Sequence, residues 1–415
     1  MNEKILTSKW VFVRKKDAQG NVVRHRTRIT IKGCQQRYGV NYWETYAPVV
    51  AQESVKFILL LALHLALSAR HVGFVTAFQN GPIGEGVDIY MEMPEYFDDG
   101  SGRVFYVDDL IIVGTDEKIE LVLRELRAKF EIKDLGAGTD LLHMEVSYIP
   151  GEMLWISQRG YIDKVLKRFG MEDCRPVATP QSLGDLPEPA DEHDPGVNDP
   201  NIPYRELVGC LQYLVQAKRV LRYLGKYMSK YTKEHFTAAK RVLRYLQGTR
   251  DYGLLWKKST SSDLHFIAYA DADLGSEKDD RRSNTGFVLQ MNGCTYAFKS
   301  HKQTIAHDDT CSTEFIAAAE CAVMIVWTHN LCEELNLRRR HPTVLFQDNQ
   351  STIKVIKTMK GNYKIKGVDL KYHKYCSTTD MLADIFTKPL GSTQFGKLRE
   401  KLNVVMLPVL DRNKD

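Results

Sequence analysis

The chain opens on an alternating pattern that predicts a β-hairpin. Residues 9–13 and 22–32 are rich in β-branched and aromatic side chains, and residues 17–21 between them contain the glycine and asparagine that suit a tight turn. Alternate side chains of a strand share one face, and in the second segment that face is basic. It carries Arg24, Arg26, Arg28 and Lys32. Both a solvated strand face and a phosphate-binding surface fit this pattern.

Two more apolar segments shape the N-terminal half. The run at 57–67 is about half as long as the roughly 20 residues that a membrane-spanning helix needs, and it contains His64, so it predicts a buried helix. Residues 103–114 are two apolar runs interrupted by Asp108 and Asp109, which predicts strand, turn and strand. Two carboxylates held at the tip of such a hairpin suit Mg²⁺. Aspartate is also a common turn residue, so an ordinary turn is the alternative.

A change of composition divides the chain. Residues 175–203 contain seven of the fourteen prolines together with six acidic residues. That composition is typical of a linker between folded parts. The segments on either side, 1–174 and 204–415, each have the size of a domain, so we expect two lobes.

The C-terminal half has the pattern of an α/β domain. A strand is predicted at 265–271, and a hairpin that turns at an Asn-Gly pair is predicted at 286–299. A long helix follows over 313–336, with Ser312 as its N-cap. A further strand at 343–348 comes next, and two shorter helical segments follow it. This alternation of strands and helices favours a sheet covered by helices.

Four acidic residues occupy notable positions in this half. Asp271 and Asp348 each end a predicted strand. Glu314 begins the long helix, and Asp384 lies near the start of a later helical segment. The C-terminal edges of strands are where α/β sheets gather their sites. The same residue types are common as turn formers and at helix N-termini, so a structural role is the alternative for each of them.

Composition narrows the class of protein. Apolar residues make up 43% and charged residues 26% of the 415 residues, which excludes a disordered, collagen-like or coiled-coil chain. The 57 basic and 52 acidic residues give a net charge of +5, which is compatible with nucleic acid. The eight cysteines form no C-x-x-C pair, so reduced thiols are expected rather than a zinc ribbon or a disulfide framework. No secretory signal opens the chain, so we expect an intracellular protein.

Ordered motifs along nearly the whole chain carry a family resemblance. The first set is KWVF at 9–12, ETYAPV at 44–49, TAFQNG at 76–81, IYMEMPE at 89–95, YVDD at 106–109 and FEIKDLG at 130–136. The second set is YADAD at 269–273, DRRSNTGF at 280–287, DNQS at 348–351 and LADIFTKPL at 382–390. With these motifs the chain resembles the reverse transcriptase and ribonuclease H portions of the Pol polyprotein of Ty1/copia-type retrotransposons.

The resemblance implies a mixed α+β and α/β architecture. Its parts are a reverse-transcriptase fingers and palm lobe at 1–174, a linker at 175–203, a helical connection at 204–260, a ribonuclease H-like α/β domain at 261–392 and a C-terminal tail at 393–415. The palm is expected to be incomplete, because only residues 96–105 separate two motifs between which the family has a long further segment.

A polymerase site is implied at Asp108 and Asp109, together with a third aspartate on an earlier strand. The position of that third aspartate is Gly73 in this chain, and glycine offers no ligand for Mg²⁺. We therefore expect the polymerase to be inactive. The basic strand matches the fingers of the family, so Lys32 and Arg28 are expected to contact a triphosphate or the template backbone.

The ribonuclease H half matches its family at all four metal-binding acids. They are Asp271, Glu314, Asp348 and Asp384. Such acids hold two Mg²⁺, which activate water for attack on the RNA strand of an RNA–DNA hybrid. The family has further residues near 373–375, in the region that supplies its last strand before the final helix, so we expect Asp384 to be misplaced in this chain. The spacing from Lys302 and Gln303 to Glu314 agrees with the family pattern, so the resemblance implies Glu314 rather than Glu320 as the second acid.

The implied partners are an RNA template, DNA, an RNA–DNA hybrid and, for an active polymerase, dNTPs. No membrane partner is expected, and the resemblance implies a location in cytoplasmic particles or the nucleus. Two alternatives stay open at this point. One is a noncatalytic nucleic-acid binder that keeps the basic strand, and the other is a transposon remnant that yields no stable protein.

Overall fold

The computed structural model describes most of the chain. The described residues are 8–16, 22–31, 51–74, 109–136, 140–141, 144–183, 187, 196–212, 214, 218–276, 280–358 and 372–406. Of the strands at 8–16 and 22–31 it describes the backbone alone. Contacts divide the chain into two compact units, one within 1–50, 71–112 and 117–135 and the other within 51–70, 113–116 and 136–415.

The hairpin predicted at the start of the chain is confirmed. Strand β1 (Ser8–Lys16) pairs antiparallel with β2 (Val22–Ile31), with Ser8 opposite Ile31. The register shifts between Lys15 and Lys16, at the end of β1. Arg24, Arg26 and Arg28 all belong to β2 at alternate positions, so the backbone places them on one face of this strand.

A small sheet forms the described remainder of the first unit. Its strands, in the order β4-β3-β5, are β4 (Asp109–Gly114), β3 (Ser68–Phe74) and β5 (Ile132–Asp134). Helix α2 (Asp116–Lys129) covers it, because Ile119 and Leu123 on one side of the helix pack with Val72 of the sheet.

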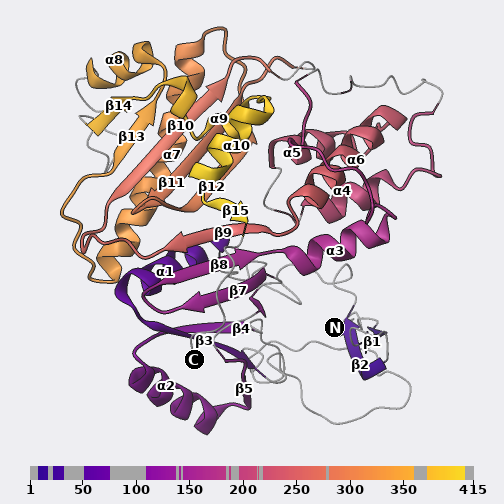
Figure 1. Ribbon diagram of the computed structural model, residues 1–415, viewed down its shortest axis with the longest axis vertical. Coiled ribbons are helices and arrows are strands. Elements are labelled where there is room, and N and C mark those ends of the chain that lie inside the picture. Colours follow the sequence, from indigo (N-terminus) through magenta and orange to yellow (C-terminus); the bar gives the residue numbers. More distant parts are fainter. Residues whose placement is uncertain are drawn as a thin grey trace, which may run out of the picture. The chain divides into compact units, whose positions relative to one another are not determined.

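The second unit contains the α/β sheet that the sequence predicted. Its strand order is β12-β11-β10-β13-β14 (Figure 1). The strands are β10 (Phe266–Asp273), β11 (Asn284–Met291), β12 (Cys294–Lys302), β13 (Val344–Gln347) and β14 (His373–Tyr375). The first three are antiparallel neighbours, whereas β13 is parallel to β10 and β14 is parallel to β13. This arrangement confirms a mixed α/β fold.

Four helices accompany this sheet. They are α7 (Thr310–Glu334), α8 (Gln350–Thr358), α9 (Asp384–Thr387) and α10 (Ser392–Lys401). Helix α7 packs on β10 and β11, and its small side chains Ala317, Ala318 and Cys321 are buried in that contact layer. Small residues let the helix approach the sheet closely.

Helix α7 starts earlier than predicted. It begins at Thr310, and Asp309 is its N-cap, with the Asp309 carboxylate accepting a hydrogen bond from the backbone N–H of Ser312 at 2.8 Å. The prediction of Ser312 as the cap is wrong, because a carboxylate three residues upstream is the stronger acceptor at a helix N-terminus.

By length and composition, helix α7 could cross a membrane. The core helix of a globular protein passes the same test, and α7 packs on the sheet.

The second unit has another five-stranded sheet, built from distant parts of the chain. Its order is β15-β9-β8-β7-β6. The strands are β6 (Asp140–Leu141), β7 (Met144–Ile149), β8 (Met153–Ser157), β9 (Tyr252–Lys257) and β15 (Val404–Met406). The pairing of β8 with β9 joins a segment before the proline-rich stretch to one after it.

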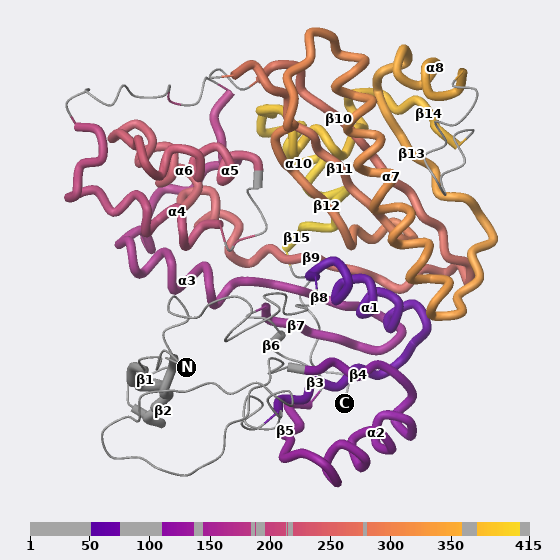
Figure 2. Tube along the Cα trace, turned by 180° about the vertical axis from the view of Figure 1, so that it is seen from behind, coloured from indigo at the N-terminus to yellow at the C-terminus, as the bar shows by residue number. Residues whose placement is uncertain are grey.

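The buried helix predicted at 57–67 is confirmed as α1 (Gln52–Leu65). It packs on β12 and β8 (Figure 2), so this N-terminal helix belongs to the same unit as the α/β sheet. Phe57 is fully buried there and contacts the rings of Phe266 and Tyr296. From its position in the sequence this helix is predicted to belong to the lobe at 1–174, and the contacts place it in the second unit instead.

Four further helices share one apolar core. They are α3 (Arg159–Arg168), α4 (Tyr204–Gln212), α5 (Lys218–Lys226) and α6 (Lys233–Gly248). The described start of the proline-rich segment lies along α6, since Val177 N–H donates to Arg244 O and Arg241 donates to Thr179 Oγ1. The start of the proline-rich segment, at Val177 and Thr179, therefore packs on α6.

The segment expected as a C-terminal tail begins at 393, and its described residues, 393–406, contain regular elements. It contributes most of α10 and the whole of β15, and Phe395 and Leu398 are buried. Strand β15 pairs with β9, so these residues complete the second sheet. The prediction of a tail is therefore wrong for residues 393–406, because their apolar side chains pack against elements that are distant in the sequence.

Candidate carboxylate centre

Four elements bring four acids together in the second unit. Asp271 lies in β10, Asp348 directly follows β13, Asp384 begins α9 and Glu314 lies in the first turns of α7. Carboxylate oxygens of Asp271, Asp348 and Asp384 all lie within 4.8 Å of one another. The expectation that Asp384 is misplaced is wrong, because β14 still forms beside β13 and α9 still reaches the end of β10.

Contacts of α9 with β11 and β12 fix the position of Asp384. A Cβ at Gly286 of β11 would lie 2.7 Å from Thr387 Cγ2 and 3.0 Å from Ala383 O, so only glycine allows this approach. Ser300 Oγ donates to Phe386 O at 2.7 Å. A four-residue helix cannot hold its own place, so these contacts determine where its carboxylate points.

Glu314 is buried close to the aspartates. Gln347 Nε2 donates to Glu314 O at 2.9 Å and lies 3.2 Å from Glu314 Oε2. Desolvation raises the pKa of Glu314 to about 9, and the charges of Asp271 and Asp348 act in the same direction. Glu320, the alternative weighed from the sequence, pairs instead with His301 at 2.5 Å.

Asp384 is also held partly in its neutral form. Burial and the neighbouring charge of Asp271 raise its pKa to about 7, while Lys388 opposes this shift. The nearby Thr387 hydroxyl donates to Asp271 Oδ2. Acids that repel one another in a desolvated position are characteristic of sites built to receive a cation.

Lys388 was missed by the sequence analysis. Its Nζ lies 2.9 Å from Asp271 Oδ1, 2.8 Å from Asp384 Oδ1 and 3.7 Å from Asp348 Oδ2. Asp271 and Asp384 raise the pKa of Lys388 above its ordinary value despite its burial. The available signal was its place four residues after Asp384, which puts both side chains on one side of a helical turn.

The donor set suits a hard divalent cation. All four groups are carboxylates, and oxygen ligands are those that Mg²⁺ prefers. An ammonium already lies among three of them, which shows that a cation has room there. Asp271, Glu314, Asp348 and Asp384 therefore fit the metal ligands that the resemblance implied.

Raising the pH from about 7 to about 8 is expected to destabilise the metal-free protein by about 1 kcal/mol. With a pKa of about 9 against an ordinary 4.5, Glu314 keeps its proton in the folded state, whereas the unfolded chain has lost it. The folded state then binds more protons, so its stability falls as pH rises. Urea unfolding in EDTA at several pH values measures this slope.

The control for this slope is a pair of matched substitutions on α7. Glu314→Gln should flatten the dependence, and Glu320→Gln should leave it unchanged. The window lies above the titration of buried His329 and His373, whose pKa values are lowered to about 4. Asp384, with a pKa of about 7, and the buried thiols of Cys294 and Cys321, whose pKa values are raised, add to the slope in the same direction, so the difference between the variants is the measurement. A slope as steep in Glu314→Gln as in the parent would contradict the assignment.

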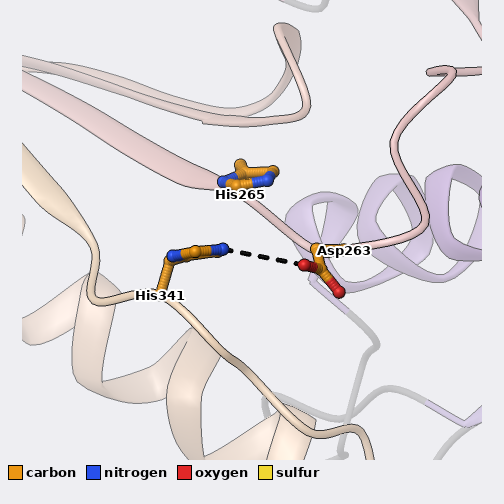
Figure 3. Close-up of side chains that lie close together, drawn as sticks. All are labelled: Asp263, His265 and His341. Carbon is orange, nitrogen blue, oxygen red and sulfur yellow. Dashed lines mark ion pairs between the residues drawn. The ribbon is translucent and has the colours of Figure 1, made fainter.

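A second cluster of metal-type ligands lies before the start of β10. It consists of Asp263, His265 and His341 (Figure 3). His341 Nε2 is 3.6 Å from Asp263 Oδ2, and Arg340 Nη1 is 3.2 Å from Asp263 Oδ1. The two imidazole rings are stacked with 4.5 Å between centroids and 17° between planes, so their lone pairs lie in two nearly parallel planes that do not meet at one ion. Asp263, His265 and His341 therefore form a polar surface contact rather than a metal site.

The remaining predicted site residues fall largely outside the described part of the chain. Asp108 and Lys32 lie outside it, and Asp109 is known only as the first residue of β4. The side chains of Arg24, Arg26 and Arg28 are not described either. Gly73 lies in β3, the strand next to β4, where the missing third aspartate was expected.

Comparison with known proteins gives one family match. The family model described as reverse transcriptase (RNA-dependent DNA polymerase) matches residues 1–105 and 98–182. Among solved structures, LC11-RNase H1, crystallised in complex with an RNA/DNA hybrid, is similar over 29% of this chain and 93% of that protein. Its 12% identity and TM-score of 0.22 are too low to carry an argument.

Several relatives match nearly the whole chain. The Pol polyprotein from transposon TNT 1-94 of Nicotiana tabacum is 29% identical over 95% of this chain and 35% of its own length. The Pol polyprotein from transposon RE1 of Arabidopsis thaliana is 28% identical over 97% of the chain and 32% of its own. The chain thus spans about a third of these polyproteins. An uncharacterized mitochondrial protein of Arabidopsis thaliana is 30% identical over 54% of the chain and 93% of its own length.

Proposed function

The chain belongs to the family of Ty1/copia-type retrotransposon Pol polyproteins, and we propose that its C-terminal part is a two-metal ribonuclease H. The observation that carries this proposal is the convergence of Asp271, Asp348 and Asp384 within 4.8 Å, with Glu314 buried beside them. These acids come from four separate elements, so their meeting is a property of the fold. An acid centre of this kind suits hydrolysis of a phosphodiester.

The four acids would hold two Mg²⁺ at the C-terminal end of β10. When bound, Mg²⁺ supplies an activated water and neutralises charge on the leaving oxygen. Asp271 is fully buried and is fixed by the Thr387 hydroxyl, so it would act as the central, immobile ligand. Asp348 is 13% exposed, so substrate would approach from its side of the centre. The raised pKa of Glu314 favours its protonated form, so metal binding there would release a proton.

The proposed substrate is the RNA strand of an RNA–DNA hybrid. Recognition of such a duplex depends on its shape, its phosphates and its 2′-hydroxyl groups rather than on base sequence. The net charge of +5 is compatible with this partner. The proposed boundaries of the domain remain 261–392, with α10, β15 and α1 as further parts of the same compact unit.

We propose that the polymerase of this chain is inactive. Gly73 occupies β3, the strand beside the one that Asp109 begins, and so removes one of three carboxylates. Only residues 96–105 stand where the family has a longer palm segment. Binding of dNTPs is therefore not expected to lead to primer extension.

Cleavage of a labelled RNA–DNA hybrid by the purified chain tests the proposal. We expect RNA-strand cleavage that requires Mg²⁺, stops on addition of EDTA, and falls roughly 10- to 100-fold in Asp348→Asn, which removes one ligand at the exposed side. Primer extension, run in parallel, should give no product. Hybrid binding by a folded sample without cleavage would refute the enzyme and favour the nucleic-acid binder suggested by the basic face of β2.

A further inference from the structure

Lys388 lies at the centre of the carboxylate group. Its ammonium nitrogen is 2.9 Å from Asp271 Oδ1, 2.8 Å from Asp384 Oδ1 and 3.7 Å from Asp348 Oδ2. An ammonium has three donors, and three carboxylates surround this one. They are the same three whose oxygens converge within 4.8 Å. The lysine thus takes the position that the proposed function gives to a metal ion.

We propose that Lys388 is a built-in counter-ion of this centre, which occupies the cation position in the metal-free protein and leaves it when Mg²⁺ binds. The inference rests on the proposed function, since it concerns the same acids. By competing for their oxygens, Lys388 sets the Mg²⁺ concentration at which the centre fills.

The backbone of Lys388 is fixed, whereas its side chain has room to move. Its N–H donates to Asp384 O at 2.9 Å, and Pro389 restricts the backbone that follows. The side chain is 31% exposed and borders a cavity of about 110 Å³ that Gln181 and Arg219 also line. A lysine carries its charge on a flexible four-carbon stem. The ammonium can therefore leave the carboxylates without a change of backbone.

Two cations cannot share this position. Mg²⁺ requires oxygen ligands at about 2.0–2.1 Å in octahedral geometry. An ammonium within hydrogen-bond distance of two of these oxygens blocks such an ion and repels it. In the metal-free protein the same ammonium offsets the repulsion among the desolvated acids. Removing it should strengthen metal binding and weaken the metal-free fold.

Titration calorimetry of the full chain with Mn²⁺, a probe for the Mg²⁺ position, tests this competition. Lys388→Met and Lys388→Gln remove the charge and keep much of the side-chain length, and Gln keeps hydrogen-bond donors if Met folds poorly. Both are expected to bind Mn²⁺ roughly 10- to 100-fold more tightly than the parent. Both should also unfold at a lower temperature in EDTA. Lys397→Met, which removes an exposed ammonium that shares Asp380 with Lys401, should change neither.

Equal or weaker Mn²⁺ binding by both Lys388 variants would overturn the inference. One such outcome is a variant that binds Mn²⁺ as the parent does but loses affinity for the hybrid. That result would mean that the ammonium binds a phosphate of the substrate. Failure of the proposed function gives a different result. In that case Asp271→Asn would not reduce Mn²⁺ binding in the parent or in the Lys388 variants.

Discussion

Asp271→Asn is expected to lower Mg²⁺-dependent hybrid cleavage by at least about 1,000-fold, since metal ligation supplies several kcal/mol of transition-state stabilisation. Asp271 is fully buried, its charge raises the pKa of both Glu314 and Asp384, and its carboxylate accepts a hydrogen bond from the Thr387 hydroxyl. An asparagine amide keeps the size of the side chain but turns one metal ligand into a donor. Initial rates of RNA-strand cleavage at saturating Mg²⁺ measure the loss.

The matched control for this substitution is Asp263→Asn. Asp263 lies before the start of β10, in the contact with His341 and Arg340, whereas Asp271 lies near the other end of the same strand. The control should keep parental cleavage within about twofold, as expected for exposed ion pairs that contribute little. If both variants cleave like the parent, the acids around Asp271 are not the catalytic centre.

Gly286→Ala is expected to destabilise the protein by about 1–3 kcal/mol, the usual effect of overpacking a tight contact. The added Cβ would lie 2.7 Å from Thr387 Cγ2, and 3.0 Å from both Ala383 O and Phe386 Cβ, so α9 must move away from β11. Asp384 moves with that helix. A displacement of about 1 Å costs on the order of 100-fold in rate, so cleavage should fall by a similar factor. Urea unfolding and cleavage rates measure the two effects.

Gly396→Ala is the matched control, because it makes the same change in a helix with open space. No atom lies within 4 Å of the Cβ position at Gly396 in α10. Alanine is the better helix former, so this variant should be stabilised by up to about 1 kcal/mol and should cleave normally. Parental stability and cleavage in Gly286→Ala would mean that α9 does not depend on its close approach to β11.

Local patterns were enough to predict much of the architecture. The hairpin at the start, the helix at 57–67, the strand at 265–271 and the long helix after 312 are all present, because hydrophobic period and turn residues act over short stretches. The cap of α7 was missed, since Asp309 and Ser312 both suit an N-cap and only the hydrogen bond to Ser312 N–H decides between them.

The sequence by itself determined the family, named the four acids of the proposed centre and showed the absence of an aspartate at Gly73, because motif order and residue type can be read without coordinates. Only the tertiary structure decided that Asp384 reaches Asp271 and Asp348, that α1 and β15 complete the same unit, and that Lys388 lies among the carboxylates. These facts depend on contacts between elements that are distant in the sequence, such as the contact of Lys388 with Asp271, which lies 117 positions earlier. Such contacts form when the faces of helices and sheets pack together, and a local pattern of side chains does not specify which faces meet.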